Sequence, residues 1–178
     1  MRIGLFDQHW GERRERERFE REIVGQVRAA HNFARWIVGD HNDAEDVVQE
    51  ATLRAFKSYG SFRGGDVRSW FLSIVRNTCM NHLRARNRRI EFELEDSSVA
   101  HPAPSAVEVI ERQLDGERLR RAIDALPPAL KELLILREFE QMSYAELAAV
   151  ADIPIGTVMS RLSRARERLR VALCEEEP

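Results

Sequence analysis

Two short helices around a tight turn are encoded by Ser143-Tyr144-Ala145-Glu146-Leu147 and Ile153-Pro154-Ile155-Gly156-Thr157-Val158-Met159-Ser160-Arg161-Leu162-Ser163-Arg164-Ala165-Arg166. Ser143 and Glu146 have the spacing of an S-x-x-E capping box, which predicts where the first helix begins. Pro154 disfavours helix in the residue before it, so the first helix should end there and a turn should follow. This arrangement is typical of a helix-turn-helix, whose second helix lies in the DNA major groove.

The second helix has two chemically different faces. Its apolar residues recur at helical spacing and should face the core: Val158, Leu162, Ala165 and Leu169. The opposite side carries Thr157, Ser160, Arg161, Arg164 and Arg168. Arginine binds guanine bidentately or clamps phosphate, and serine or threonine does either at short range. The arginine stripe alone is equally consistent with a solvated surface helix, but the capping box, the turn and the stripe together favour DNA binding.

Charge is strongly segregated along the chain, although the formal net charge is only -2 over 178 residues. Lys57–Arg89 has eight basic residues and one acidic residue, a net of +7. Ile90–Glu117 has a net of -7, and Pro154–Arg170 has a net of +4. Binding responds to local potential, so the basic blocks favour a nucleic-acid partner.

The chain reads as all-α, with two small helical domains joined by a flexible acidic linker. Hydrophobic residues make up 43% of the sequence and aromatic residues 7%, which suits aliphatic helical cores. Residues 12–89 should form the first domain and residues 107–174 the second. Between them, residues 90–106 combine acidic residues, three serines and two prolines, which predicts an extended or disordered segment. Breaks between helices are expected at Gly39–Asn42, Tyr59–Gly65 and Leu126–Pro128.

The helix that Asp66 should cap, and that should end near Arg89, has a basic outer side. One row on that side follows at steps of four, three and four: Asn77, Asn81, Arg84 and Arg88. Also on this side or beside it are Phe62, Arg63, Ser69, Trp70, Ser73 and Arg76. Aromatic side chains stack on unpaired bases and arginines neutralise phosphate, so this side suits single-stranded or melted nucleic acid. For Trp70, a core position is an open alternative.

The helix predicted over residues 43–59 has an acidic outer face with one leucine in it. Its members are Asp43, Asp46, Gln49, Glu50 and Leu53. A leucine surrounded by charges suits a protein partner with a basic surface. Taken alone, a solvated acidic face is the more common explanation, because exposed leucines are frequent.

Three groups of residues resemble motifs of bacterial extracytoplasmic-function sigma factors, a compact branch of the sigma-70 family. Asp43-Ala44-Glu45-Asp46-Val47-Val48-Gln49-Glu50-Ala51 resembles the DAEDxxQE signature. A second group resembles the promoter-melting segment of the family: Phe62-Arg63, Trp70-Phe71-Leu72, Ile74, Arg76-Asn77 and Leu83-Arg84. A third group resembles region 4 of the family: Leu126-Pro127 and the stretch from Gly156 to Arg166. The motifs occur in family order and cover about residues 20 to 170.

The resemblance implies a function and its partners. The chain would bind core RNA polymerase, through the β′ clamp helices and the β subunit, and would direct initiation at promoters. The docking helix would be the one that carries Asp43, Asp46, Gln49, Glu50 and Leu53. The −10 element would be recognised and held open by Phe62, Arg63, Trp70, Arg76, Asn77, Asn81, Arg84 and Arg88. The −35 element would be read by Thr157, Val158, Ser160, Arg161, Arg164 and Arg168. An anti-sigma factor is a further implied partner, and the acidic linker would thread through polymerase channels.

Two features depart from the family pattern. Asn81 stands where the family usually has Asp, which removes a carboxylate from the DNA-facing row. The Arg/Glu-rich segment Gly11–Glu22 lies outside the shared motifs and reads as a solvated helix with i,i+4 ion pairs.

An enzyme is the competing class, and the sequence disfavours it. It has no P-loop, no dinucleotide-binding glycine motif, no H-E-x-x-H and no G-x-S-x-G. We expect no cofactor or metal, ordinary thiols at Cys79 and Cys174, no membrane insertion and a cytoplasmic location. A helix-turn-helix regulator without polymerase docking is the alternative function. A helical adaptor without DNA would leave both basic rows unexplained.

Overall fold

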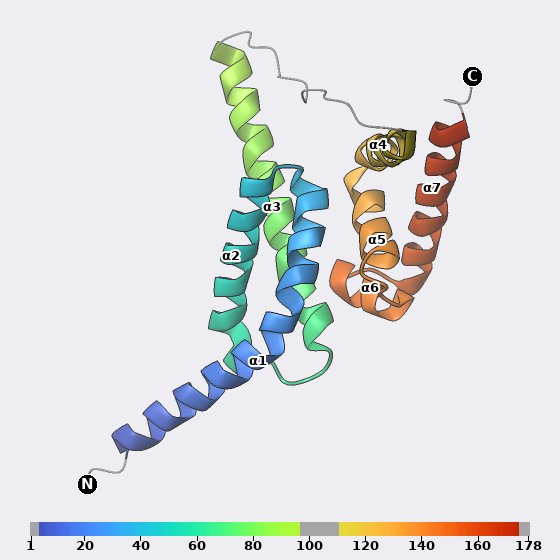
Figure 1. Cartoon of the computed structure of the whole chain (residues 1–178). Helices are drawn as coiled ribbons and strands as arrows, with labels where there is room; N and C mark the ends of the chain where they lie inside the picture. Colours follow the sequence, from blue (N-terminus) through green and yellow to red (C-terminus); the bar gives the residue numbers. More distant parts are fainter. Residues whose placement is uncertain (1–3, 97–110, 175–178) are drawn as a thin grey trace.

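The computed structural model describes residues 4–96 and 111–174, and it gives the side-chain surroundings of residues 13–88 and 116–174 (Figure 1). The described residues form α-helices with one short 3-10 turn, so the all-α prediction is confirmed. The first group, which we call the N-terminal group, contains α1 (Gly4–Val38), α2 (His41–Ser58), the 3-10 turn Tyr59–Ser61 and α3 (Val67–Asp96). The second, which we call the C-terminal group, contains α4 (Glu111–Asp124), α5 (Pro128–Glu138), α6 (Tyr144–Ala151) and α7 (Ile155–Cys174).

The N-terminal group is a bundle of three helices around an apolar core. Phe33, Val47 and Phe71 contribute one large or branched buried side chain from each helix. Gly39 ends α1 at φ +86°, a left-handed conformation that glycine adopts without strain. Asp40 then caps α2, because its carboxylate accepts hydrogen bonds from the next backbone amides at 2.8 and 3.0 Å.

The C-terminal group contains the helix-turn-helix. The predicted capping box is present: Ser143 N donates to the Glu146 carboxylate at 2.6 Å, and Glu146 N donates to Ser143 Oγ at 3.3 Å. Asp152 ends α6 with φ 53°, in the left-handed region. The fully buried Leu162 fixes α7 on the core of the group, so its other side faces outward.

The helix α3 is longer than the sequence predicted. It continues to Asp96 instead of ending near Arg89, so residues 90–96 are helical and do not belong to an extended linker. The physical reason is local: these residues include no glycine or proline, and three of the seven are glutamates, which favour helix. The rest of the expected linker, residues 97–106, and the expected start of α4 at residues 107–110 lie outside the described residues.

The two groups pack against each other through α1 and α3 on one side and α5 and α6 on the other. In Figure 1, α5 and α6 lie beside α1 and α3, and contacts between α3 and α6 and between α1 and α5 join the groups. Trp36 of α1 packs against Phe139, just after α5, with ring centroids 5.1 Å apart. The basic side of α3 therefore lies near this junction.

Candidate nucleic-acid interface

The expected row on α3 is exposed along its whole length. Asn77, Asn81, Arg84 and Arg88 are all exposed, as their spacing predicts for one side of a helix. Within the row, Arg84 donates to the Asn81 side-chain oxygen at 3.3 Å. The row presents amide and guanidinium groups to solvent, which are groups that bind base edges and phosphates.

Arg76 does not lie free beside this row. Its guanidinium forms a bidentate ion pair with Glu132 of α5, at 2.8 Å from Nε and 3.0 Å from Nη2. The Glu132 side chain is 1% exposed and that of Arg76 is 20% exposed. In this conformation Arg76 is a contact between the two groups, and its Nε and Nη2 donors are occupied by Glu132.

An aromatic cluster lies at the amino-terminal end of α3. Phe62 packs on Trp70 with centroids 4.8 Å apart, and Trp70 also lies 6.1 Å from the ring of Tyr59. Phe62 and Trp70 are half-buried, so Trp70 contributes to the core and still exposes part of its ring. Arg63, in the loop between them, is exposed. The cluster offers aromatic surface and a cation together.

Asp66 fixes the start of α3 beside this cluster. Its carboxylate accepts hydrogen bonds from the backbone of Arg68 at 3.2 Å and of Ser69 at 3.0 Å, and also from the Ser69 hydroxyl. Burial alone would raise the pKa of Asp66, but the hydrogen bonds from Ser69 and Arg68 outweigh it and hold the pKa below its ordinary value. Ser69 is 6% exposed, so the prediction that it lies on the outer side was wrong.

The Arg/Glu-rich segment of α1 is attached to the same region. Arg18 and Glu22 form the expected i,i+4 ion pair at 2.9 Å. Tyr59 then donates its hydroxyl hydrogen to Glu22 at 2.7 Å, and Phe19 packs edge-on against Tyr59 at 5.2 Å. This part of α1 thus supports the turn that carries the aromatic cluster, a role that spacing alone did not indicate.

The acidic face of α2 is mostly as predicted, with one correction. Asp46, Gln49, Glu50 and Leu53 are exposed, and Leu53 keeps 56% of its surface in solvent. Asp43 is instead turned toward α3, where its carboxylate pairs with His82 at 3.2 Å and lies 3.9 Å from Arg86. It joins two helices of the same group and does not belong to the exposed face.

Phe56 extends this exposed face and was missed. It is 45% exposed and lies three residues after Leu53, so the two apolar side chains share one side of α2. Its ring also touches Phe19 at a centroid distance of 5.2 Å. The helical spacing of Leu53 and Phe56 was the signal in the sequence that could have placed Phe56 on this face.

The outer side of α7 carries hydroxyl and guanidinium groups. Ser160, Arg164 and Arg168 are exposed, and Thr157 and Arg161 are half-buried at its edges. Ser160 donates to the Thr157 carbonyl at 3.0 Å, which leaves its oxygen able to accept from a partner.

Val158 is fully buried, so it supports α7 from beneath and cannot be the DNA contact that the resemblance implied. Ser163 is exposed on the outer side between the arginines and was not predicted. Arg166 is committed elsewhere, because it pairs with Glu138 at 2.9 Å. The arginines of α7 therefore differ in their availability.

The described residues give no sign of a metal site or a membrane span. Over residues 4–96 and 111–174, no group of three or more His, Cys, Asp or Glu side chains could hold a metal ion. Within the same ranges, no helix combines the length and apolarity that crossing a membrane requires.

Comparisons with known proteins match both helical groups. The family model described as sigma-70 region 2 matches residues 24–89, and that of sigma-70 region 4 matches residues 116–169. The chain is 38% identical over 146 residues to the RNA polymerase sigma-H factor of Pseudomonas aeruginosa, covering 76% of each chain. It is 39% identical over 137 residues to the ECF RNA polymerase sigma-E factor of Escherichia coli, covering 71% of this chain and 72% of that one.

A solved structure has a similar arrangement. The sigma factor RpoE in complex with the anti-sigma factor NepR, from Bartonella quintana, matches with a TM-score of 0.73 and 28% identity. The match covers 90% of this chain and 99% of that chain, so it extends over both helical groups.

Proposed function

Because the chain belongs to the sigma-70 family, in its extracytoplasmic-function branch, we propose that three of its surfaces divide the work of a sigma factor. The chain binds core RNA polymerase and directs transcription initiation at promoters. The observation that carries the division is that two exposed basic faces lie on different helical groups, while an exposed acidic face lies on a third helix. The chain acts by binding in the cytoplasm, and the chemistry of RNA synthesis is that of the polymerase.

The outer side of α7 reads the −35 element in this proposal. Ser160, Ser163 and Arg164 are exposed at the middle of that side, where the second helix of a helix-turn-helix meets base edges. Arg168 lies one turn beyond Arg164 and contacts phosphate.

The row on α3 and the aromatic cluster hold the opened −10 element. Asn77, Asn81 and Arg84 supply polar contacts to bases and phosphates, and the exposed parts of Phe62 and Trp70 stack on bases that have left the duplex. A base that is already unpaired costs less to capture than one extruded from the stack. Binding energy at this face thus shifts the melting equilibrium toward the open strands.

The acidic face of α2 docks the β′ clamp helices of the polymerase. Leu53 and Phe56 form an apolar centre, and Asp46 and Glu50 lie at its rim, which is the usual anatomy of a protein interface. We further propose that an anti-sigma factor regulates the chain, as NepR binds the similar RpoE.

The test compares two charge reversals on α2. Asp46→Arg should weaken binding to purified core polymerase by tenfold or more and lower promoter-dependent transcription equally, because it reverses a rim charge of the docking face. Glu45→Arg is the control, since Glu45 is equally charged and exposed but lies on another side of α2, near His41. Promoter binding by the free chain should be unchanged in both variants. Equal loss of polymerase binding in the two variants would contradict the docking face, and failure of the wild-type chain to support any core-dependent initiation would contradict the function.

A further inference from the structure

We propose that Glu132 of the C-terminal group holds the basic side of α3 closed by occupying the position that a DNA phosphate takes beside Arg76 in a promoter complex, and that Glu140 adds a second contact between the two groups. The free chain would then be a closed form, and exposure of its −10 surface would require the two groups to separate. This inference rests on the proposed function of α3.

Glu132 provides the stronger of the two contacts. Both of its carboxylate oxygens accept hydrogen bonds from the Arg76 guanidinium, in the planar bidentate geometry with which arginine also binds phosphate. At 1% exposure it is a buried carboxylate on a helix that is otherwise rich in leucine. A buried charge requires a partner, and here the partner is a residue of the other group.

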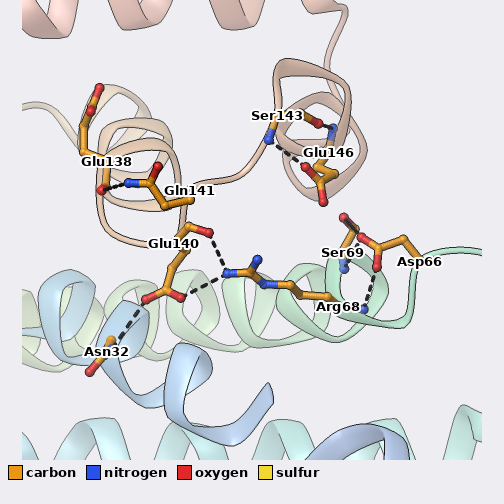
Figure 2. Close-up of polar contacts among 9 residues, drawn as sticks. All are labelled: Asn32, Asp66, Arg68, Ser69, Glu138, Glu140, Gln141, Ser143 and Glu146. Atoms are coloured by element: carbon orange, nitrogen blue, oxygen red, sulfur yellow. Dashed lines mark hydrogen bonds and ion pairs between the residues drawn. The ribbon is translucent and has the colours of Figure 1, made fainter. Parts of the chain in front are cut away.

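Glu140 provides the second contact, at the turn between α5 and α6. Figure 2 shows it between Asn32 and Arg68. Arg68 donates to the Glu140 backbone carbonyl at 2.6 Å and to its carboxylate at 3.2 Å, and the Asn32 amide lies 3.5 Å from the same carboxylate. The Nε atom of Arg68 is buried without a hydrogen-bond partner, so this contact is incompletely satisfied. Glu132 is therefore the residue to test.

The closed arrangement also restricts access to the exposed row. A cleft of about 440 Å³ is lined on one side by Asn77, Asn81 and Arg84 of α3. Its other side is formed by Pro128 and the following residues of α5. The first turn of α5 therefore lies beside this part of the row, where a bound nucleic acid would meet it.

The energetics favour a reversible contact. Desolvation of the buried carboxylate and the largely buried guanidinium offsets most of their attraction, so such a pair adds little net stability. Loss of one partner is far more costly, because it leaves the other charge buried and unpaired. In a chain of two groups, the unpaired charge regains water when the groups separate, which does not require unfolding. A DNA phosphate offers Arg76 the same bidentate partner and so competes with Glu132.

The experiment measures the distance between the groups in the full-length chain without polymerase. Spin labels are attached to the exposed Cys174 of α7 and to a cysteine introduced at Val24→Cys of α1, where the native side chain is 69% exposed. Cys79 is buried and should stay unlabelled. Double electron–electron resonance then gives the distance distribution for wild type, Glu132→Gln and Glu138→Gln. Figure 2 shows the Glu138 side chain pointing away from α1 and α3, so Glu138→Gln is the matched control.

Glu132→Gln should raise the open-to-closed ratio by roughly 30-fold or more, the factor that corresponds to about 2 kcal/mol for one partner of a buried charge pair. Binding of a fluorescein-labelled single-stranded dT20, measured by anisotropy, should tighten by up to a similar factor if the closed form dominates the wild type. Glu138→Gln should match the wild type in the distance measurement, because its partner Arg166 belongs to the same group. An unchanged distance distribution in Glu132→Gln, or equal opening in both variants, would overturn the proposal.

A charge exchange separates opening from damage to the fold. Arg76→Glu and Glu132→Arg should each open the chain alone, and together they should restore the closed distances, because the pair is re-formed with its charges reversed. A double variant that stays open would count against the contact. The two proposals can fail separately because the distances are measured without polymerase. If the closed form is wrong, the wild type still supports core-dependent transcription. If the proposed function is wrong, the measured distances are unaffected.

Discussion

Two arginines of α7 carry the same charge but differ in availability, and they allow a direct test of how the chain reads duplex DNA. Arg164 is exposed on the outer side, whereas Arg166 is paired with Glu138 at 2.9 Å. Arg164→Ala should cost about 1–3 kcal/mol of promoter affinity if it contacts a base, or roughly 5- to 150-fold. If it contacts a phosphate instead, the slope of log affinity against log salt should fall by about 0.9.

Arg166→Ala removes the same charge from the same helix, so it is the control. Its guanidinium would have to leave Glu138 before it could bind DNA, and we expect a loss of less than about threefold, in line with the small net worth of an exposed ion pair. The assay is fluorescence anisotropy of the holoenzyme on a promoter duplex at several salt concentrations. Equal losses for the two variants would show that only the net charge of α7 matters, which would refute the assignment of Arg164 to the reading face.

Three further outcomes test the packing and the caps. Leu162→Ala should lower the free energy of unfolding, measured with urea, by about 2–5 kcal/mol because its side chain is fully buried. Met159→Ala, at a side chain that is 53% exposed, should lower it by about 0.5 kcal/mol or less. Similar losses in the two variants would contradict this packing. Cys174 should react with a maleimide at pH 7, while Cys79, whose pKa is raised to about 12 by burial, should react only after unfolding. Mass spectrometry counts the labels, and two labels on the native chain would contradict this difference. Asp66→Ala should cost about 1 kcal/mol at pH 7, because the cap of α3 is lost. Since folding lowers the pKa of Asp66, its stabilisation is present above the unfolded pKa and is lost as the pH falls through the folded one, so the wild type and Asp66→Ala should converge in acid. A gap independent of pH would argue against the carboxylate.

The sequence predicted the features that depend on local spacing. The capping box of Ser143 and Glu146, the break at Gly39 and the buried side of α7 are all present, because caps, breaks and helix faces are set within a few residues. The exposed row on α3 follows from the same rule of helical spacing. Roles in binding that were assigned to these faces stay predictions.

What the sequence did not predict are partners that lie far along the chain. Arg76 has the spacing of an outer residue, but Glu132 lies 56 residues away and covers it. Asp43 likewise faces outward on a lone helix, and only the packing of α3 brings His82 to it. Helical periodicity shows which side a residue occupies and leaves open what packs there. A local signal did exist at Glu132, a carboxylate within a run of leucines, because such a group must find a partner.

The ion pair between Arg76 and Glu132 joins two parts of one molecule, and this decides how its strength must be judged. Residues 97–110 connect α3 to α4 covalently, so separated groups meet again at an effective concentration in the millimolar range for a short connection. A contact that is too weak to hold two separate proteins together at cellular concentrations is then sufficient to keep the two groups of this chain in the closed form. The balance between the two forms is also independent of how much of the protein is present, so a change in its abundance alone would not alter the fraction that is ready to bind.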